Sequence, residues 1–146
     1  MPSVERTFEV AAAPAAVIEY LSDFAHAEEW DPGTERCTRN ETGPIVVGSS
    51  WHNVSKVAGV ETELTYTLTE TSPGRLVFIG VNDSATSTDT IDVRPSGAGS
   101  EVTYRADIEM HGMSRLAAPA VKLVFEKVAH DTVAQMTAVL NQLGQI

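Results

Sequence analysis

The sequence predicts an α+β fold in which helices pack on a curved antiparallel sheet of seven strands. Three observations predict it. Short alternating segments separated by tight turns fill most of the chain up to residue 111. Two short helical segments interrupt this pattern after the first strand, and one long amphipathic helix follows it. The length of 146 residues suits a single domain over residues 1–146.

The first strand and the first helix are predicted by their local patterns. Residues 3–10 alternate apolar and polar side chains, as a half-buried strand does. Pro14 suits the first residue of a helix because its φ is already near the helical value and its missing N–H would be unpaired there. Val17, Leu21 and Phe24 then recur at helical spacing. We therefore expect a helix starting at Pro14.

A second short helix is predicted directly after the first. Asp23 is a plausible N-cap, because its carboxylate accepts hydrogen bonds from free backbone N–H groups. The helix would end at Trp30, since Asp31-Pro32-Gly33 is a strong turn sequence. Two short helices between strands suggest a fold that encloses something.

The other strands are separated by turns rich in Gly, Pro, Asn and Ser. The segment 60–71 alternates most clearly, with Leu64, Tyr66 and Leu68 on one face and mainly Thr and Glu on the other. Tight turns between neighbouring strands indicate an antiparallel meander with one buried face. The six strands are predicted at residues 34–41, 48–57, 60–71, 75–81, 85–94 and 101–111.

The long helix is predicted over residues 120–143, which contain no Gly or Pro. Its apolar residues recur at a period near 3.6, and Gly144 is a suitable stop. An amphipathic helix of this length must bury its apolar stripe against a large surface. The concave face of the sheet is the surface that the predicted elements provide.

Charge and composition exclude several classes of function. The formal net charge is −10, with only ten Lys and Arg residues. Nucleic acids and anionic membranes attract clustered basic residues, so neither is expected as a partner. Cys37 is the only cysteine, which rules out an internal disulfide and suits a reducing compartment. As a lone cysteine it is expected to be a small buried hydrophobe.

No motif points to a metal, a nucleotide or a membrane. The four histidines lack metal-binding spacing, and Gly97-Ala98-Gly99 suits a hairpin turn, not a phosphate cradle. No signal-peptide pattern or stretch long enough to span a membrane is visible. We therefore expect a cytoplasmic monomer or weak homodimer without cofactor or metal.

Several sequence segments carry a family resemblance. The chain is similar to the helix-grip (SRPBCC) superfamily, which contains START-like, birch-pollen-allergen-like and polyketide cyclase/dehydrase proteins. The resemblance covers essentially the whole chain and implies a cavity between the C-terminal helix and the concave face. It also makes Trp30 and Pro32 candidates for the rim of that cavity. The matching segments are Ala13-Pro14-Ala15-Ala16-Val17, Leu21-Ser22-Asp23-Phe24, Trp30 with Pro32-Gly33, Gly99-Ser100-Glu101-Val102-Thr103-Tyr104, and residues 112–121.

Large side chains on inward phases are the candidates for lining such a cavity. Tyr66 and Tyr104 fall on the apolar phase of their strands, where each hydroxyl needs a partner. These residues could instead be plain core. The candidate ligand-binding residues are Trp30, Trp51, Tyr66, Phe78, Tyr104, Ile108, Phe125, Val128 and Thr132.

Asp89 is the most unusual candidate, because it shares the phase of Ile91 and Val93. A buried carboxyl must be hydrogen-bonded or neutral, and burial raises its pKa. It could orient a polar ligand group or act as a general base. Alternatively, the strand is bulged or solvated at this point.

Three functions remain open. The favoured one is a carrier or sensor for a hydrophobic or amphipathic small molecule, lipid or polyketide-like. An enzyme of the cyclase/dehydrase type is the second, with Asp89, Tyr66 and Tyr104 as weak catalytic candidates, and we lean against it because few polar residues fall on inward phases. A protein-interaction module, like the toxin and co-chaperone relatives, is the third.

Overall fold

The structure, a computed structural model, describes residues 3–57, 59–111 and 118–143, with side chains except at 57 and 118–125. Its strands and helices follow the predicted order. The elements are β1 (Ser3–Val10), α1 (Pro14–Ser22), the 3-10 helix η1 (Phe24–His26), α2 (Ala27–Trp30), β2 (Thr34–Arg39), β3 (Ser50–Val57), β4 (Val60–Ser72), β5 (Arg75–Val81), β6 (Ala85–Ser96), β7 (Gly99–Met110) and α3 (Ala118–Leu143).

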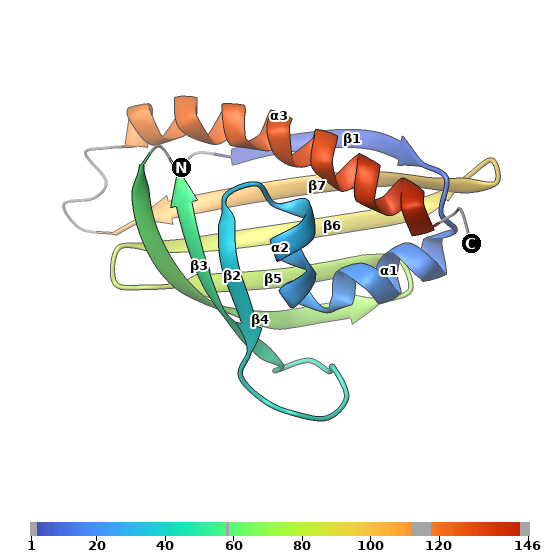
Figure 1. Cartoon of the computed structure of the whole chain (residues 1–146), viewed down its shortest axis with the longest axis horizontal. Coiled ribbons are helices and arrows are strands. Elements are labelled where there is room, and N and C mark those ends of the chain that lie inside the picture. Colours follow the sequence, from blue (N-terminus) through green and yellow to red (C-terminus); the bar gives the residue numbers. More distant parts are fainter. Residues whose placement is uncertain (1–2, 58, 112–117, 144–146) are drawn as a thin grey trace.

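The strands form one antiparallel sheet in the order β1-β7-β6-β5-β4-β3-β2. Neighbours in the sheet are neighbours in sequence except at one edge, where β1 pairs with β7. The helices lie on one face of this curved sheet, and α3 runs along β1 (Figure 1). This arrangement confirms the predicted α+β helix-grip architecture.

The helical segment after β1 is built as its sequence predicts, with one subdivision. Pro14 occupies the start of α1, and the Asp23 carboxylate accepts a hydrogen bond from the Ala25 N–H at 3.0 Å. The predicted second helix is divided into η1 and α2. A second role of Asp23 was not predicted: the same oxygen, Oδ1, also accepts a 2.9 Å hydrogen bond from Nε1 of Trp51, which ties this turn to β3.

The element boundaries differ from the predicted ones mainly at turns. The predicted strands 34–41 and 48–57 are shorter, because the loop between Arg39 and Ser50 is longer than its composition suggested. The β6–β7 turn needs only Gly97 and Ala98, since the positive φ of Gly97 (58°) allows a tight reversal. The long helix starts at Ala118, so Pro119 lies in its first turn.

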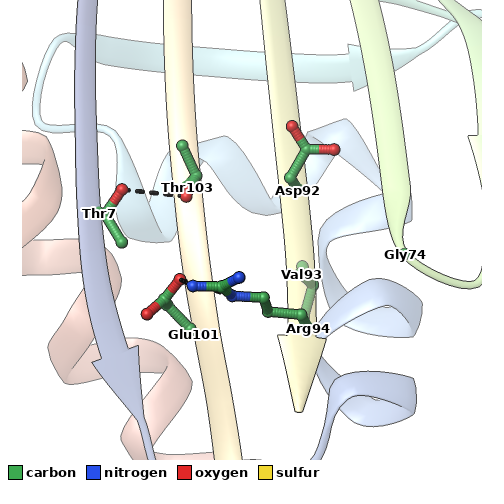
Figure 2. Close-up of a pocket in the computed structure, with 7 residues that line it drawn as sticks. All are labelled: Thr7, Gly74, Asp92, Val93, Arg94, Glu101 and Thr103. Atoms are coloured by element: carbon green, nitrogen blue, oxygen red, sulfur yellow. Dashed lines mark hydrogen bonds and ion pairs between the residues drawn. The ribbon is translucent and has the colours of Figure 1, made fainter. Parts of the chain in front are cut away.

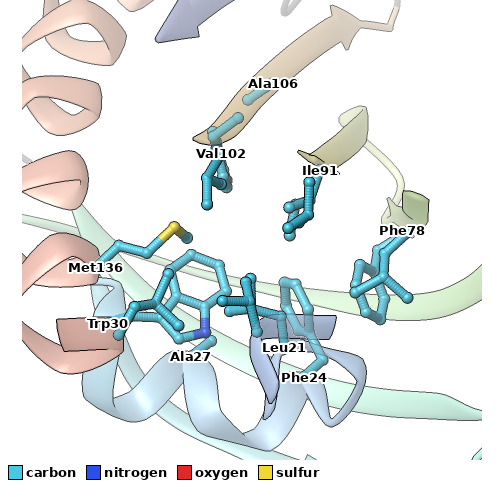
Figure 3. Close-up of a cluster of buried hydrophobic side chains, with 14 of the residues drawn as sticks. Leu21, Phe24, Ala27, Trp30, Phe78, Ile91, Val102, Ala106 and Met136 are labelled. Carbon is cyan, nitrogen blue, oxygen red and sulfur yellow. The ribbon is translucent and has the colours of Figure 1, made fainter. Parts of the chain in front are cut away.

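Large buried side chains from the sheet and from the helices meet in one core (Figure 3). The Phe24 ring stacks on Tyr66 at 4.4 Å between centroids and lies 4.7 Å from Phe78. Met136 brings α3 into the same cluster. None of the helices in the described ranges has the length and apolar character that crossing a membrane would require.

Candidate functional site

Asp89 lies in the middle of β6 on the face that the helices cover. The strand is regular there, because Asp89 pairs with Phe78 on one side and Ala106 on the other. Its side chain is only 4% exposed. The alternative of a bulged or solvated strand at this position is therefore wrong.

Two hydroxyl groups hold the Asp89 carboxyl. The Tyr104 hydroxyl donates a 2.7 Å hydrogen bond to Oδ2, and the Ser87 hydroxyl donates a 3.3 Å bond to Oδ1. Tyr104 reaches Asp89 diagonally from β7, within range for a long side chain on a neighbouring strand. We call Ser87, Asp89 and Tyr104 together the Asp89 cluster. All three are buried.

Burial raises the pKa of Asp89 to about 7, because the carboxylate loses its hydration. The Tyr104 and Ser87 hydrogen bonds oppose this rise, whereas the negative charge of Asp31 adds to it. Both the neutral acid and the carboxylate are therefore populated near neutral pH. A group in this state can accept or donate a proton.

Tyr66 on β4 is separated from the β6 residues of the Asp89 cluster by a glycine, Gly80 of β5. It pairs with Gly80 on β5, and Gly80 pairs with Ser87 on β6. A Cβ atom on Gly80 would come within 2.7 Å of the Tyr66 ring, so the glycine provides the space that the ring occupies. Burial and the charge of Asp89 raise the pKa of Tyr66 well above its usual value, an effect that Ser87 partly offsets.

Asp31 is a functional candidate that sequence reasoning missed. Its two carboxylate oxygens accept 3.0 Å bonds from the Gly33 N–H and the Thr34 hydroxyl, which is the turn role its sequence context predicts. Its negative charge nevertheless raises the pKa of Asp89, Tyr66 and Tyr104. Burial raises the pKa of Asp31 itself. Nothing in an Asp-Pro-Gly turn signals this proximity.

The predicted aromatic residues belong to the buried hydrophobic core. Trp30, Trp51 and Phe78 are almost completely buried. Trp30 was expected at a cavity rim, and this is wrong, because it packs edge-on against Tyr104 while the neighbouring Pro32 is exposed. The Trp30 Nε1 group is buried without a hydrogen-bond partner in the described structure.

The inner face is less filled toward the C-terminal end of β7. On β7, Val102 is fully buried. Ile108 and Met110 lie on the same face of the strand but are partly exposed. Leu64 on β4 is also partly exposed. The Asp89 cluster thus lies between a packed region and apolar side chains of β7 that are partly exposed. We call Ile108 and Met110 the open end.

The remaining predicted residues lie on α3. Thr132 is buried and Val128 partly exposed. The Phe125 side chain lies outside the described part of the structure, so its predicted role stays a prediction.

A depression of about 620 Å³ lies on the opposite face of the sheet, away from the helices (Figure 2). Its lining is polar, and its charges are paired with one another or with neighbours: Arg94 bonds Glu101, and Asp92 bonds Arg75. It offers neither an apolar wall nor an unpaired charge, which argues against a site for an apolar ligand.

Other candidate chemistries find little support. Cys37 is buried, and this raises its pKa to about 12, so the thiol stays protonated and is a poor nucleophile. In the described ranges, no three His, Cys, Asp or Glu side chains are grouped to hold a metal ion.

Comparison with known proteins gives a family and a set of similar structures. A family model described as "Polyketide cyclase / dehydrase and lipid transport" matches residues 1–141. A search of curated proteins gave no match. A START superfamily protein from Mycobacterium smegmatis is similar in structure, with a TM-score of 0.80 and 16% identity over 97% of this chain and 98% of that one.

Two further solved structures share the fold at low sequence identity. A Thermus thermophilus protein has a TM-score of 0.78 and 13% identity, over 94% of this chain and 95% of that one. The aromatase/cyclase Zhui from a Streptomyces species has a TM-score of 0.75 and 19% identity, over 97% and 92%. At such identities the similarity shows the fold.

Proposed function

The chain belongs to the polyketide cyclase/dehydrase and lipid transport family, and from this premise we propose that it binds a hydrophobic or amphipathic small molecule as a carrier or sensor. The molecule, lipid or polyketide-like, would lie between α3 and the sheet. One observation carries this proposal: a buried polar cluster adjoins inward-facing apolar side chains that remain partly exposed. Ligand pockets combine these features, an apolar wall and a few placed polar groups.

Burial of apolar surface would supply most of the affinity. A ligand that removed about 200 Å² of apolar surface from water would gain about 5 kcal/mol before the costs of binding. The Asp89 cluster would add direction, because its hydrogen bonds require a polar group at a defined position. The ligand would therefore be oriented as well as retained.

The test is to identify and then block the bound molecule. Purified protein is denatured, the extract is analysed by mass spectrometry, and identified molecules are titrated back by calorimetry. Ile108→Arg, which places a charge at the open end, should abolish binding. The control is Glu109→Arg, on the next residue but exposed on the other face, which should bind normally.

Circular dichroism shows whether each variant is folded. Normal binding by a folded Ile108→Arg variant would place the ligand elsewhere. Absence of any extracted or titratable apolar ligand in the unaltered protein would contradict the proposal itself.

The second candidate is an enzyme of the cyclase/dehydrase type, and the acid–base state of Asp89 favours it. A carboxyl with a pKa of about 7 beside a tyrosine hydroxyl is suited to move protons at neutral pH. A shaped cavity that folds a reactive polyketide supplies the remaining rate enhancement through proximity.

This candidate is tested by comparing the products formed from a linear poly-β-ketone thioester with and without protein. Asp89→Asn and Tyr104→Phe should each lower product formation by about a hundredfold or more, because a positioned acid or base typically contributes about 10²–10⁴-fold to the rate. If both variants leave the product profile unchanged, Asp89 and Tyr104 have no catalytic role.

A further inference from the structure

We infer that the ligand binds with its polar end toward the Asp89 cluster, and that this end is an uncharged hydrogen-bond donor such as a hydroxyl group. Ligands that end in a carboxylate or a phosphate are rejected. This inference rests on the proposed function and names the chemistry of its ligand. It follows from the exposure gradient of the inner face and from the charges that surround Asp89.

The change in side-chain exposure along the inner face of the sheet sets the orientation of the ligand. The apolar side chains of the open end are partly exposed, whereas Tyr104 of the Asp89 cluster lies deeper along β7. Ser87 marks the transition, because it pairs with Ile108 of the open end and bonds Asp89 of the cluster. An amphipathic molecule therefore matches the face when its apolar part covers the open end and its polar end reaches Ser87.

The hydrogen bonds within the cluster set the polarity of that end. The Tyr104 and Ser87 hydroxyls both donate to Asp89, one to each carboxylate oxygen. Each carboxylate oxygen has a second acceptor position. Both protons are already used, so when Asp89 is ionised the cluster offers acceptors and no free donor of its own to an incoming group. A ligand hydroxyl supplies the donor that this arrangement lacks.

The surrounding charges set the selection against anions. Asp89 is joined by Asp31, whose negative charge reaches Asp89 and Tyr104. The buried polar and charged side chains of the described ranges include no lysine or arginine. An anionic end would have no cationic partner, and like charges brought together in a binding site cost several kcal/mol.

The experiment compares two ligands that differ only at the polar end, decan-1-ol and decanoate, by calorimetry at about pH 8, where decanoate is ionised. We expect the dissociation constant of the alcohol to be lower by about tenfold or more. Asp89→Asn, which removes the charge but keeps the shape, should reduce this ratio by strengthening decanoate binding.

The matched control is Asp92→Asn. Asp92 lies on the same strand but on the outer face, half-exposed and paired with Arg75, so the same change of charge there should leave the ratio unchanged. Circular dichroism confirms that both variants are folded.

The outcomes separate the inference from the proposed function. Decanoate binding as tight as the alcohol overturns the inference and leaves ligand binding intact. A folded Asp89→Asn variant with an unchanged ratio overturns it as well. If the unaltered protein binds neither probe and yields no apolar ligand on extraction, the proposed function itself fails. The comparison of probes on the unaltered protein does not depend on any variant being folded.

Discussion

At the scale of single residues, Asp89 determines the chemistry of the inner face. A carboxyl group this deeply buried loses its hydration, and two hydroxyl bonds only partly replace it. Its pKa rises from 3.8 to about 7, which makes the ionised form costly in the folded state. The folded protein therefore holds this proton more tightly than the unfolded chain does.

This difference predicts how stability depends on pH. Because the folded-state pKa is the higher one, the stabilising contribution of Asp89 is complete below about pH 4 and is lost as the pH rises to about 7. A shift of about three units corresponds to about 4 kcal/mol. Asp31, whose pKa is also raised, acts in the same direction.

Asp89→Asn should remove the contribution of Asp89. We expect this variant to be more stable than the unaltered protein at about pH 8, and the difference to shrink toward about pH 4. Urea denaturation across this range measures both. A difference that does not vary with pH would mean that Asp89 does not titrate as its burial predicts.

At the scale of elements, the start of β7 holds the segment that leads from β1 into α1. Gly99 lies against the backbone where β1 ends, so that an added Cβ would collide with the Val10 carbonyl oxygen. The next residue, Ser100, is fully buried and donates a 2.7 Å bond to the carbonyl of Ala12. The segment leading into α1 is therefore held against this end of β7.

Two glycines in this hairpin are expected to respond differently to alanine. Gly97→Ala should cost only about 1 kcal/mol, because Gly97 has a positive φ but open space around its Cα. Gly99→Ala should lower the free energy of unfolding by about 3 kcal/mol or more, because the added Cβ would meet the Val10 carbonyl oxygen, a backbone atom that cannot rotate away. Urea denaturation of both variants measures the costs, and equal values would refute the close approach at Gly99.

At the scale of the whole molecule, the net charge of −10 opposes the compact state through self-repulsion. Ion pairs on exposed surfaces, such as Arg75–Asp92 and Arg105–Glu5, offset it only locally. Salt screens both effects, and because 20 acidic residues face only ten basic ones, we expect the loss of net repulsion to outweigh the loss of the ion pairs.

The melting temperature should therefore rise between about 20 mM and about 500 mM sodium chloride, over which the Debye length falls from about 20 Å to about 4 Å. Differential scanning calorimetry measures this change. A melting temperature that falls with salt would mean that the surface ion pairs outweigh the net repulsion.

The sequence by itself determined the architecture of this protein. Its signals are local, and each acts over a few neighbouring residues. They are the alternation in the strands, the proline at the start of α1, the Asp23 cap and the helical period of the apolar residues in α3. They also placed Tyr66, Tyr104 and Asp89 on inward phases, because side chains alternate regularly along a strand.

Only the tertiary structure decided which inward residues meet. Asp31 and Asp89 are far apart in sequence, and the effect of the Asp31 charge on the pKa of Asp89 follows from the packing of the turn after α2 over the sheet. The burial of Trp30 and the partial exposure of Ile108 are also decided by packing between elements. Exposure depends on what lies across the interior, and no pattern along a single strand contains that information.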